Sequence, residues 1–120
     1  MNMQWEYCIL EWMRFNPEVA QRVDDAGKKE NVLALCGIRF CEGGTVRQHV
    51  LESITTQQAL QENQSFAAEM GRLGSFGWEL VQVQEKEDGW DVSNIISAFF
   101  KRPVKEGRPI NDAVNNTLSD

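Results

Sequence analysis

The first stretch of the chain carries apolar side chains at both the odd and the even positions of an extended segment. Residues 4–15 are dense in aromatic and branched side chains, and Trp5, Tyr7 and Ile9 fall on one face at a period of two. The intervening positions, Trp12 among them, are also mostly apolar. Residues 4–15 therefore predict a strand that is partly covered on both faces, as is typical of the centre of a sheet.

Two later pairs of apolar stretches are each separated by a short turn-forming segment. Residues 31–41 and 45–54 flank the segment 42–44, whose two glycines accept the positive φ of a tight turn. Residues 78–84 and 92–102 are joined by a segment that contains an Asp-Gly pair, a strong local hairpin signal. Each pair predicts a β-hairpin.

A helical spacing of apolar positions lies between the two hairpins. It predicts one main helix over residues 56–73, with a single apolar stripe turned toward a sheet. Thr55 and Gln58 form a capping box at its start, and Gly74 is the expected left-handed C-cap. Residues 16–18, where Asn precedes Pro, predict either the start of a short helix or an irregular excursion of the chain.

Together these elements predict an α+β domain: an antiparallel sheet of about five strands with one main helix packed on one face. Residues 1–103 are expected to form this single domain, and residues 104–120 a flexible or partner-bound tail. One helix cannot cover five strands. Part of the second face must therefore meet the short early helix, the tail or a second copy of the protein.

Composition and charge narrow the classes of function. The chain has 120 residues and a net charge of −6, without the cluster of Lys and Arg that a nucleic-acid-binding protein needs. No stretch has the apolar length that spans a bilayer, and the first residues do not resemble an export signal, so we expect a cytoplasmic protein. The cysteines number three, which favours free thiols over a disulfide framework.

Three short motifs resemble a known family. Trp5-Glu6-Tyr7 opens the first strand, Gly77 to Val81 follows the helix, and Phe100 to Pro103 ends the last strand. With these motifs the chain resembles a group of small uncharacterised bacterial domains, catalogued as a domain of unknown function. The resemblance covers the start and residues 56–103, whereas residues 16–54 depart from it. It implies a fold and no activity.

Candidate chemistry is sparse along the chain. Cys36, Cys41 and His49 are the nearest approach to a metal cluster, but zinc sites usually take four ligands with closely spaced cysteines, so we expect no metal and no cofactor. The same residues could form a thiol or hydrolytic site, which needs an exposed, activated thiol beside His49.

The carboxylates of predicted strands could also serve acid–base chemistry, although their spacing selects no pair. The alternative role for Glu6 and Glu79 is a cross-strand ion pair with Lys101 or Arg102. The other two strand carboxylates are Glu11 and Glu85.

The sequence as a whole favours a binding or oligomerisation domain that acts through protein–protein contact, with a homodimer as the first expectation. The interaction residues that we expect are Trp12, Trp90 and the tail after Pro103. Two alternatives stay open at this point. One is the enzyme that uses Cys36 or Cys41 with His49, and the other is an acidic inhibitor or decoy of a nucleic-acid-binding protein.

Overall fold

The computed structural model describes residues 4–15, 21–23, 29–42, 44–87 and 92–114. The elements in chain order are β1 (Trp5–Phe15), β2 (Gln21–Val23), β3 (Lys29–Asn31), β4 (Ala34–Glu42), β5 (Thr45–Ile54), α1 (Gln57–Glu62), α2 (Ser65–Ser75), β6 (Glu79–Lys86) and β7 (Val92–Pro103).

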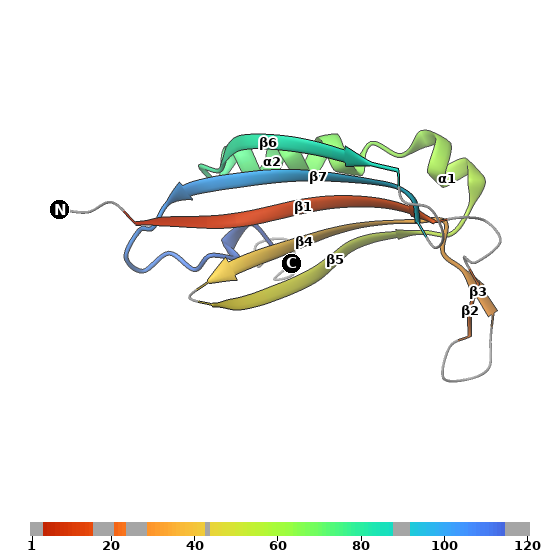
Figure 1. Cartoon of the computed structure of the whole chain (residues 1–120), viewed down its shortest axis with the longest axis horizontal. Helices are drawn as coiled ribbons and strands as arrows, with labels where there is room; N and C mark the ends of the chain where they lie inside the picture. The colour runs from red at the N-terminus through yellow and green to blue at the C-terminus, as the bar shows by residue number, and fades with distance from the viewer. Residues whose placement is uncertain (1–3, 16–20, 24–28, 43, 88–91, 115–120) are drawn as a thin grey trace.

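The main sheet has five antiparallel strands in the order β5-β4-β1-β7-β6 (Figure 1). The first strand of the sequence is therefore the central one, and it separates the two predicted hairpins, β4–β5 and β6–β7. Leu10 in the middle of β1 lies opposite Ile38 of β4 and Ala98 of β7. The expected α+β fold with an antiparallel sheet of about five strands is confirmed.

The two faces of this sheet differ in what lies over them. The face that carries Glu6, Cys8 and Leu10 packs against α2, and we call it the covered face. The face that carries Tyr7, Ile9 and Glu11 we call the open face. In Figure 1 both α1 and α2 lie on one side of the sheet, while β2 and β3 project from one end of it.

The single helix predicted over 56–73 is two helices, because the chain breaks at Asn63. This residue has extended backbone angles, and its Oδ1 accepts a hydrogen bond from the Ser65 backbone N–H at 3.1 Å. Such a local side-chain bond replaces helical pairing. The predicted Thr55 cap is also wrong by one residue: Oγ1 of Thr56 accepts the bond from the Ala59 N–H.

Helix α2 ends at Ser75, and its left-handed C-cap is Gly77 rather than the predicted Gly74. Gly77 has a φ of 88°, and the Trp78 N–H donates to the Leu73 carbonyl while the Gly77 N–H donates to the Gly74 carbonyl. This pattern is a Schellman motif. It turns the chain directly from the helix into β6 and places Trp78 beside Leu73 in the core.

Residues 21–23 form a strand, not part of the predicted early helix. Gln21–Val23 pairs antiparallel with Lys29–Asn31 in a small separate hairpin. The predicted start of that helix at residues 16–18 lies outside the described residues.

The described part of the predicted tail, residues 104–114, packs on the chain's own covered face. Ile110, Ala113 and Val114 are buried in the same core cluster as Leu73. The Val104 N–H donates to the Gln4 carbonyl at 2.9 Å and ties the start of the segment to the first strand. The folded unit therefore extends at least to Val114, beyond the boundary expected at residue 103.

Candidate functional site

Apolar side chains reach the surface along the open face. Because residues directly opposite each other in an antiparallel sheet share a face, the register gives the rows of this surface. One row runs Val46, Cys41, Tyr7, Lys101 and Glu79 from β5 to β6. Tyr7, on the central strand, is 50% exposed, and Val46, on the edge strand β5, is 59% exposed.

The neighbouring rows continue the apolar surface. Ile9 lies between Arg39 of β4 and Phe99 of β7. Val50 pairs with Gly37 at the β5 edge and is 61% exposed. Large exposed apolar patches on a folded domain mark interaction sites.

A groove of about 440 Å³ runs across the β1–β7–β6 side of the open face. Apolar and polar residues both line it, Lys101 and Gln82 among the polar ones. The Lys101 Nζ lies 4.4 Å from the centre of the Trp5 ring, a cation–π contact at the rim. The lining residues are Tyr7, Cys8, Ile9, Cys41, Val81, Gln82, Phe99, Phe100 and Lys101.

One ion pair lies near the centre of the open face. The Arg39 Nε is 2.8 Å from Oε1 of Glu11, which belongs to the central strand. The side chains are 38% and 14% exposed, respectively. Glu11 lies opposite Gly37, so no side chain from β4 stands beside it in its own row. The pair leaves the centre of an apolar surface with no net charge.

Both edge strands carry a bulge. The register shifts between Leu80 and Gln82 in β6, and between Val50 and Glu52 in β5. Bulges on edge strands disrupt the row of free backbone groups with which another strand could pair. They also redirect side chains: Val81 lines the open-face groove, whereas Val83 pairs with buried Ala98 and so lies on the covered face.

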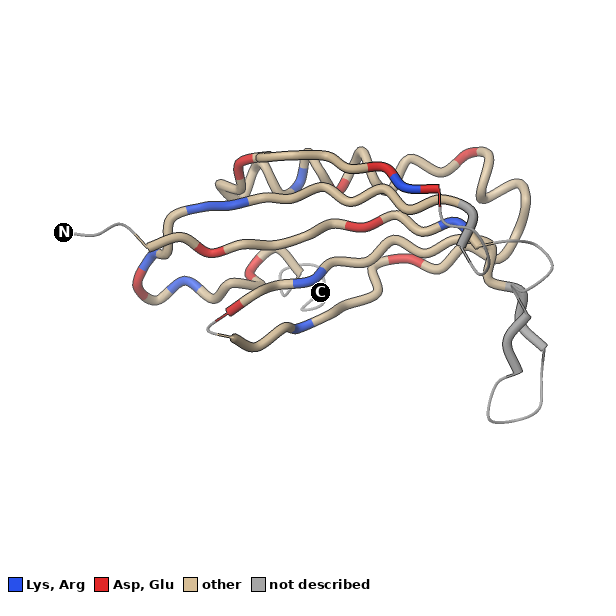
Figure 2. The backbone as a smooth tube through the Cα atoms, in the orientation of Figure 1, with Lys and Arg blue, Asp and Glu red and all other residues tan. Residues whose placement is uncertain are grey.

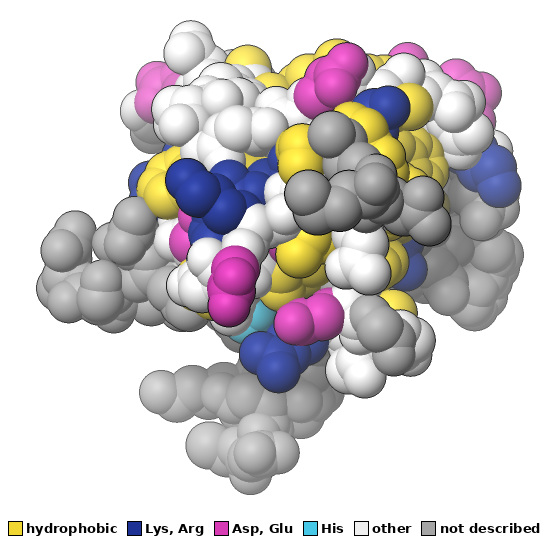
Figure 3. Space-filling model, turned by 90° about the vertical axis from the view of Figure 1, so that its left-hand side faces the viewer, with side chains coloured by type: hydrophobic (Ala, Val, Ile, Leu, Met, Phe, Trp, Pro, Cys, Tyr) yellow, Lys and Arg dark blue, Asp and Glu magenta, His cyan; other side chains and the backbone are white. Residues whose placement is uncertain are grey.

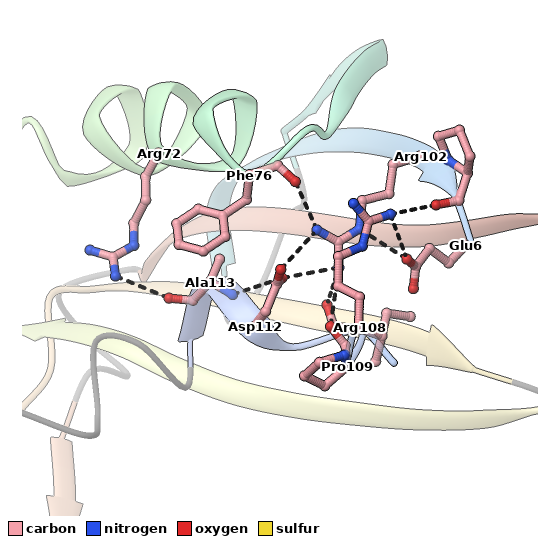
Figure 4. A network of polar contacts seen from close by, with 10 residues as sticks. Glu6, Arg72, Phe76, Arg102, Arg108, Pro109, Asp112 and Ala113 are labelled. Carbon is pink, nitrogen blue, oxygen red and sulfur yellow. Dashed lines mark hydrogen bonds and ion pairs between the residues drawn. The ribbon is translucent and has the colours of Figure 1, made fainter. Parts of the chain in front are cut away.

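The covered face holds a second and different ion-pair network, centred on Arg102 (Figure 4). Its side chain is fully buried, and its Nε donates to Oε1 of Glu6 at 3.0 Å. Nη1 donates to the Phe76 carbonyl and to Asp112, and Nη2 donates to the carbonyls of Pro109 and Ile110.

This network ties separate parts of the chain together. The Arg102 guanidinium stacks 4.2 Å from the centre of the Trp78 ring. Arg108 adds a contact to Glu6 at 3.5 Å and donates to the Pro103 carbonyl, and Arg72 donates to the Ala113 carbonyl (Figure 4). Since every donor of Arg102 has a partner, the network joins β1, β7, the end of α2 and residues 109–112 as a structural centre.

The predicted Cys36, Cys41 and His49 do not form one site. Cys36 and His49 lie on the covered face, whereas Cys41 lies on the open face. Burial raises the pKa of the Cys36 thiol to about 11, the opposite of the shift that activates a nucleophile. Burial also raises the pKa of Cys8. Among the described residues no three His, Cys, Asp or Glu side chains are grouped to hold a metal ion.

The four strand carboxylates have separate polar neighbours. The predicted pair of Glu6 with Arg102 is confirmed, and Glu79 lies opposite Lys101 as expected. Glu11 pairs with Arg39, and Glu85 accepts a hydrogen bond from Asn94 at 3.1 Å. None of these contacts brings two of the four carboxylates together for acid–base chemistry.

Of the two tryptophans predicted to mediate interaction, the structure describes Trp12, and it does not lie on the open face. Trp12 lies on the covered face, where it packs against the core and lines a groove of about 390 Å³ beside the break between α1 and α2. Trp90 lies outside the described residues. The exposed residues that the sequence argument missed are Val46, Val50 and Val81, together with the surface role of Tyr7. The alternation of Trp5, Tyr7 and Ile9 was the sequence pattern that could have indicated a shared apolar face.

Charges of both signs are spread over the described surface. Acidic and basic positions are interspersed along the strands in Figure 2. At the end of the sheet where β1 begins, Figure 3 shows side chains of both signs around exposed hydrophobic ones. At this end of the molecule the charges are mixed, unlike the single carboxylate face that the acidic-decoy alternative expects.

Comparison with known proteins identifies no relative. No family model, no curated protein and no solved structure matches the chain. The resemblance to the small bacterial domains therefore stays a prediction. No helix in the described part of the chain is long and apolar enough to cross a bilayer.

Proposed function

We propose that the protein is a self-association domain whose open sheet face packs against the same face of a second copy. The observation that carries this proposal is the exposure of Tyr7, Val46, Val50 and Val81 on one face of a sheet whose other face holds the core. Burying these side chains removes apolar surface from water, which is the main source of stability in protein association.

The dimensions of the sheet suit a dimer interface. The 11 residues of β1 and a width of five strands give a face of about 36 Å by 24 Å from standard strand spacings, or roughly 800 Å². A stable interface of standard size buries about 800 Å² on each partner. One copy of the open face therefore offers the area that a second copy needs.

The charge and the edges of the sheet favour a face-to-face arrangement. Glu11 and Arg39 neutralise each other at the centre, so two copies of this face do not repel. The bulges near Val81 and Leu51 disturb both edges and oppose edge-to-edge pairing. We expect two sheets stacked about 10 Å apart, as in a β-sandwich.

Two valines of β6 provide a matched test. Val81→Glu places a carboxylate in the open-face groove, while Val83→Glu makes the same change on the covered face at a similarly exposed position. In a two-fold dimer Val81→Glu buries two unpaired charges. We expect the dimer dissociation constant to rise at least about 100-fold, equivalent to about 2.7 kcal/mol.

Light scattering after gel filtration measures the mass of each variant, and urea unfolding checks that both remain folded. The proposal predicts that Val83→Glu stays dimeric while Val81→Glu becomes monomeric. Equal loss of association in both variants would place the interface elsewhere on the molecule.

A further inference from the structure

We propose that Glu11 and Arg39 exchange partners across the dimer and thereby fix the orientation in which two copies meet. This inference rests on the proposed self-association through the open face. It assigns to these two residues a role in specificity that is separate from the apolar area around them.

The contact between Arg39 and Glu11 is incomplete within one chain. A guanidinium has five N–H donors. The Arg39 Nε lies 2.8 Å from Oε1 of Glu11, but this buried nitrogen makes no hydrogen bond within the described part of the chain. Within the described part of the chain, Nη1 and Nη2 of Arg39 and Oε2 of Glu11 have no hydrogen-bond partner. The side chain of Arg39 is 38% exposed, so these donors are available to a molecule that covers the open face.

The buried Arg102 shows how the same chain treats a guanidinium that is removed from water. All its donors are used, by Glu6, Asp112 and three backbone carbonyls. A partner that packs on the open face would remove Arg39 from water as well. Arg39 then needs acceptors from that partner, because an uncompensated buried charge is strongly destabilising.

A second copy supplies these acceptors at the required place. Glu11 lies on the central strand, so a two-fold axis through the middle of the open face brings the two copies of this region together. If Arg39 meets Glu11 of the other copy and Glu11 meets Arg39, four charges alternate in sign about the axis. Any rotation that places like charges together is disfavoured.

The exchange predicts that a charge-swapped chain recognises itself but not the original. In the double variant Glu11→Arg/Arg39→Glu the pair can form within the chain and between two swapped chains. Against the original chain, however, it sets Glu against Glu and Arg against Arg. Mixing the swapped chain with isotope-labelled original chain, followed by native mass spectrometry, measures the fraction of mixed dimers.

We expect each chain to form its own homodimer. Random pairing would make half of all dimers mixed, and we expect the mixed fraction to be at least about tenfold lower than that. Labelled and unlabelled original chains give the statistical reference. The swap Lys105→Glu/Glu106→Lys is the control: it reverses two exposed charges that follow β7 and do not line the open-face groove, so the chains should mix nearly statistically.

The outcomes separate this inference from the proposed function. Statistical mixing of the central swap, or a folded swapped chain that stays monomeric while the original dimerises, overturns the exchange and leaves the dimer standing. A monomeric original chain overturns both.

The single variants give a second measurement that does not depend on the folding of the double variant. Glu11→Arg and Arg39→Glu should each lose self-association and regain it when mixed one to one. If the mixture stays monomeric, the exchange is excluded.

Discussion

Each face of the sheet carries an Arg–Glu pair whose glutamate belongs to the central strand, but the two pairs are completed differently. On the covered face Glu6 meets an Arg102 that is wholly buried and has every donor satisfied. On the open face Glu11 lies beside an Arg39 that is 38% exposed and whose buried Nε, 2.8 Å from Glu11, has no hydrogen-bond partner in the described part of the chain. The first pair holds parts of one chain together, and the second retains the capacity to bind another chain.

The difference follows from what each face can recruit from its own sequence. The Schellman turn at Gly77 directs the Phe76 carbonyl toward Arg102, and the segment after Pro103 brings Asp112 and two carbonyls to the same group. The described residues offer no comparable segment over the open face. We therefore expect the covered face, whose polar groups find partners within the chain, to govern the stability of the fold. We expect the open face to govern association.

Removing the cation of the covered face should have the largest effect on stability. Arg102→Met leaves Asp112 without its cation and Glu6 with only the longer contact to Arg108, and we expect a loss of about 3–5 kcal/mol in the free energy of unfolding. Lys101→Met is the control, because it removes a cation from the next residue on the open face and should cost at most about 1 kcal/mol. Urea unfolding measures both, and equal losses would remove the distinction between the faces.

The turn that helps to complete the covered face provides a smaller test. Gly77→Ala forces a side chain into a φ of 88°, which should cost about 1–2 kcal/mol. Gly74→Ala lies inside α2 with open space around it and should stabilise the protein by about 0.5–1 kcal/mol. Thermal unfolding of the two variants should therefore show shifts of opposite sign; a destabilised Gly74→Ala would instead place the essential left-handed cap there.

The pH dependence of stability reports burial of the covered-face thiols. The pKa of Cys36 is raised from 9.0 to about 11 by burial, so between these values the unfolded chain loses a proton that the folded chain keeps. The free energy of unfolding should then fall as the pH rises, by at most about 1.4 kcal/mol per pH unit for this thiol. The raised pKa of Cys8 acts in the same direction.

Urea unfolding between pH 8 and pH 11 measures this slope, using about one measurement per half unit. Cys36→Ala should make it shallower, because one of the two buried thiols is then absent. An unchanged slope in this variant would mean that Cys36 does not contribute to the pH dependence.

The regular parts of the fold could be predicted from the sequence because they depend on local alternation. The five strands of the main sheet, both of its hairpins and the helical region were found in this way, whereas the small β2–β3 hairpin was not. The break at Asn63 was missed because a side-chain hydrogen bond decides it. The C-cap was placed at the wrong glycine because Gly74 and Gly77 both follow the apolar stripe, so the stripe does not distinguish them.

The interaction surface was only partly predictable, for reasons that involve distant residues. That the helices leave part of the sheet uncovered followed from the predicted numbers of helices and strands. Which side chains lie on which face, however, depends on the strand order and on the bulges. Val81 reaches the open face because the register shifts beside it. The docking of residues 104–114 depends on the buried Arg102, whose partners lie at several separate positions in the chain.

Sedimentation equilibrium of the unaltered full chain, over a range from about 1 to 100 µM, tests the association of the open face most directly. The account predicts that the average mass rises with concentration from 13.7 kDa toward twice that value. It also predicts that Val81→Glu abolishes the rise while Val83→Glu preserves it. A mass that stays at 13.7 kDa across the range would contradict the account.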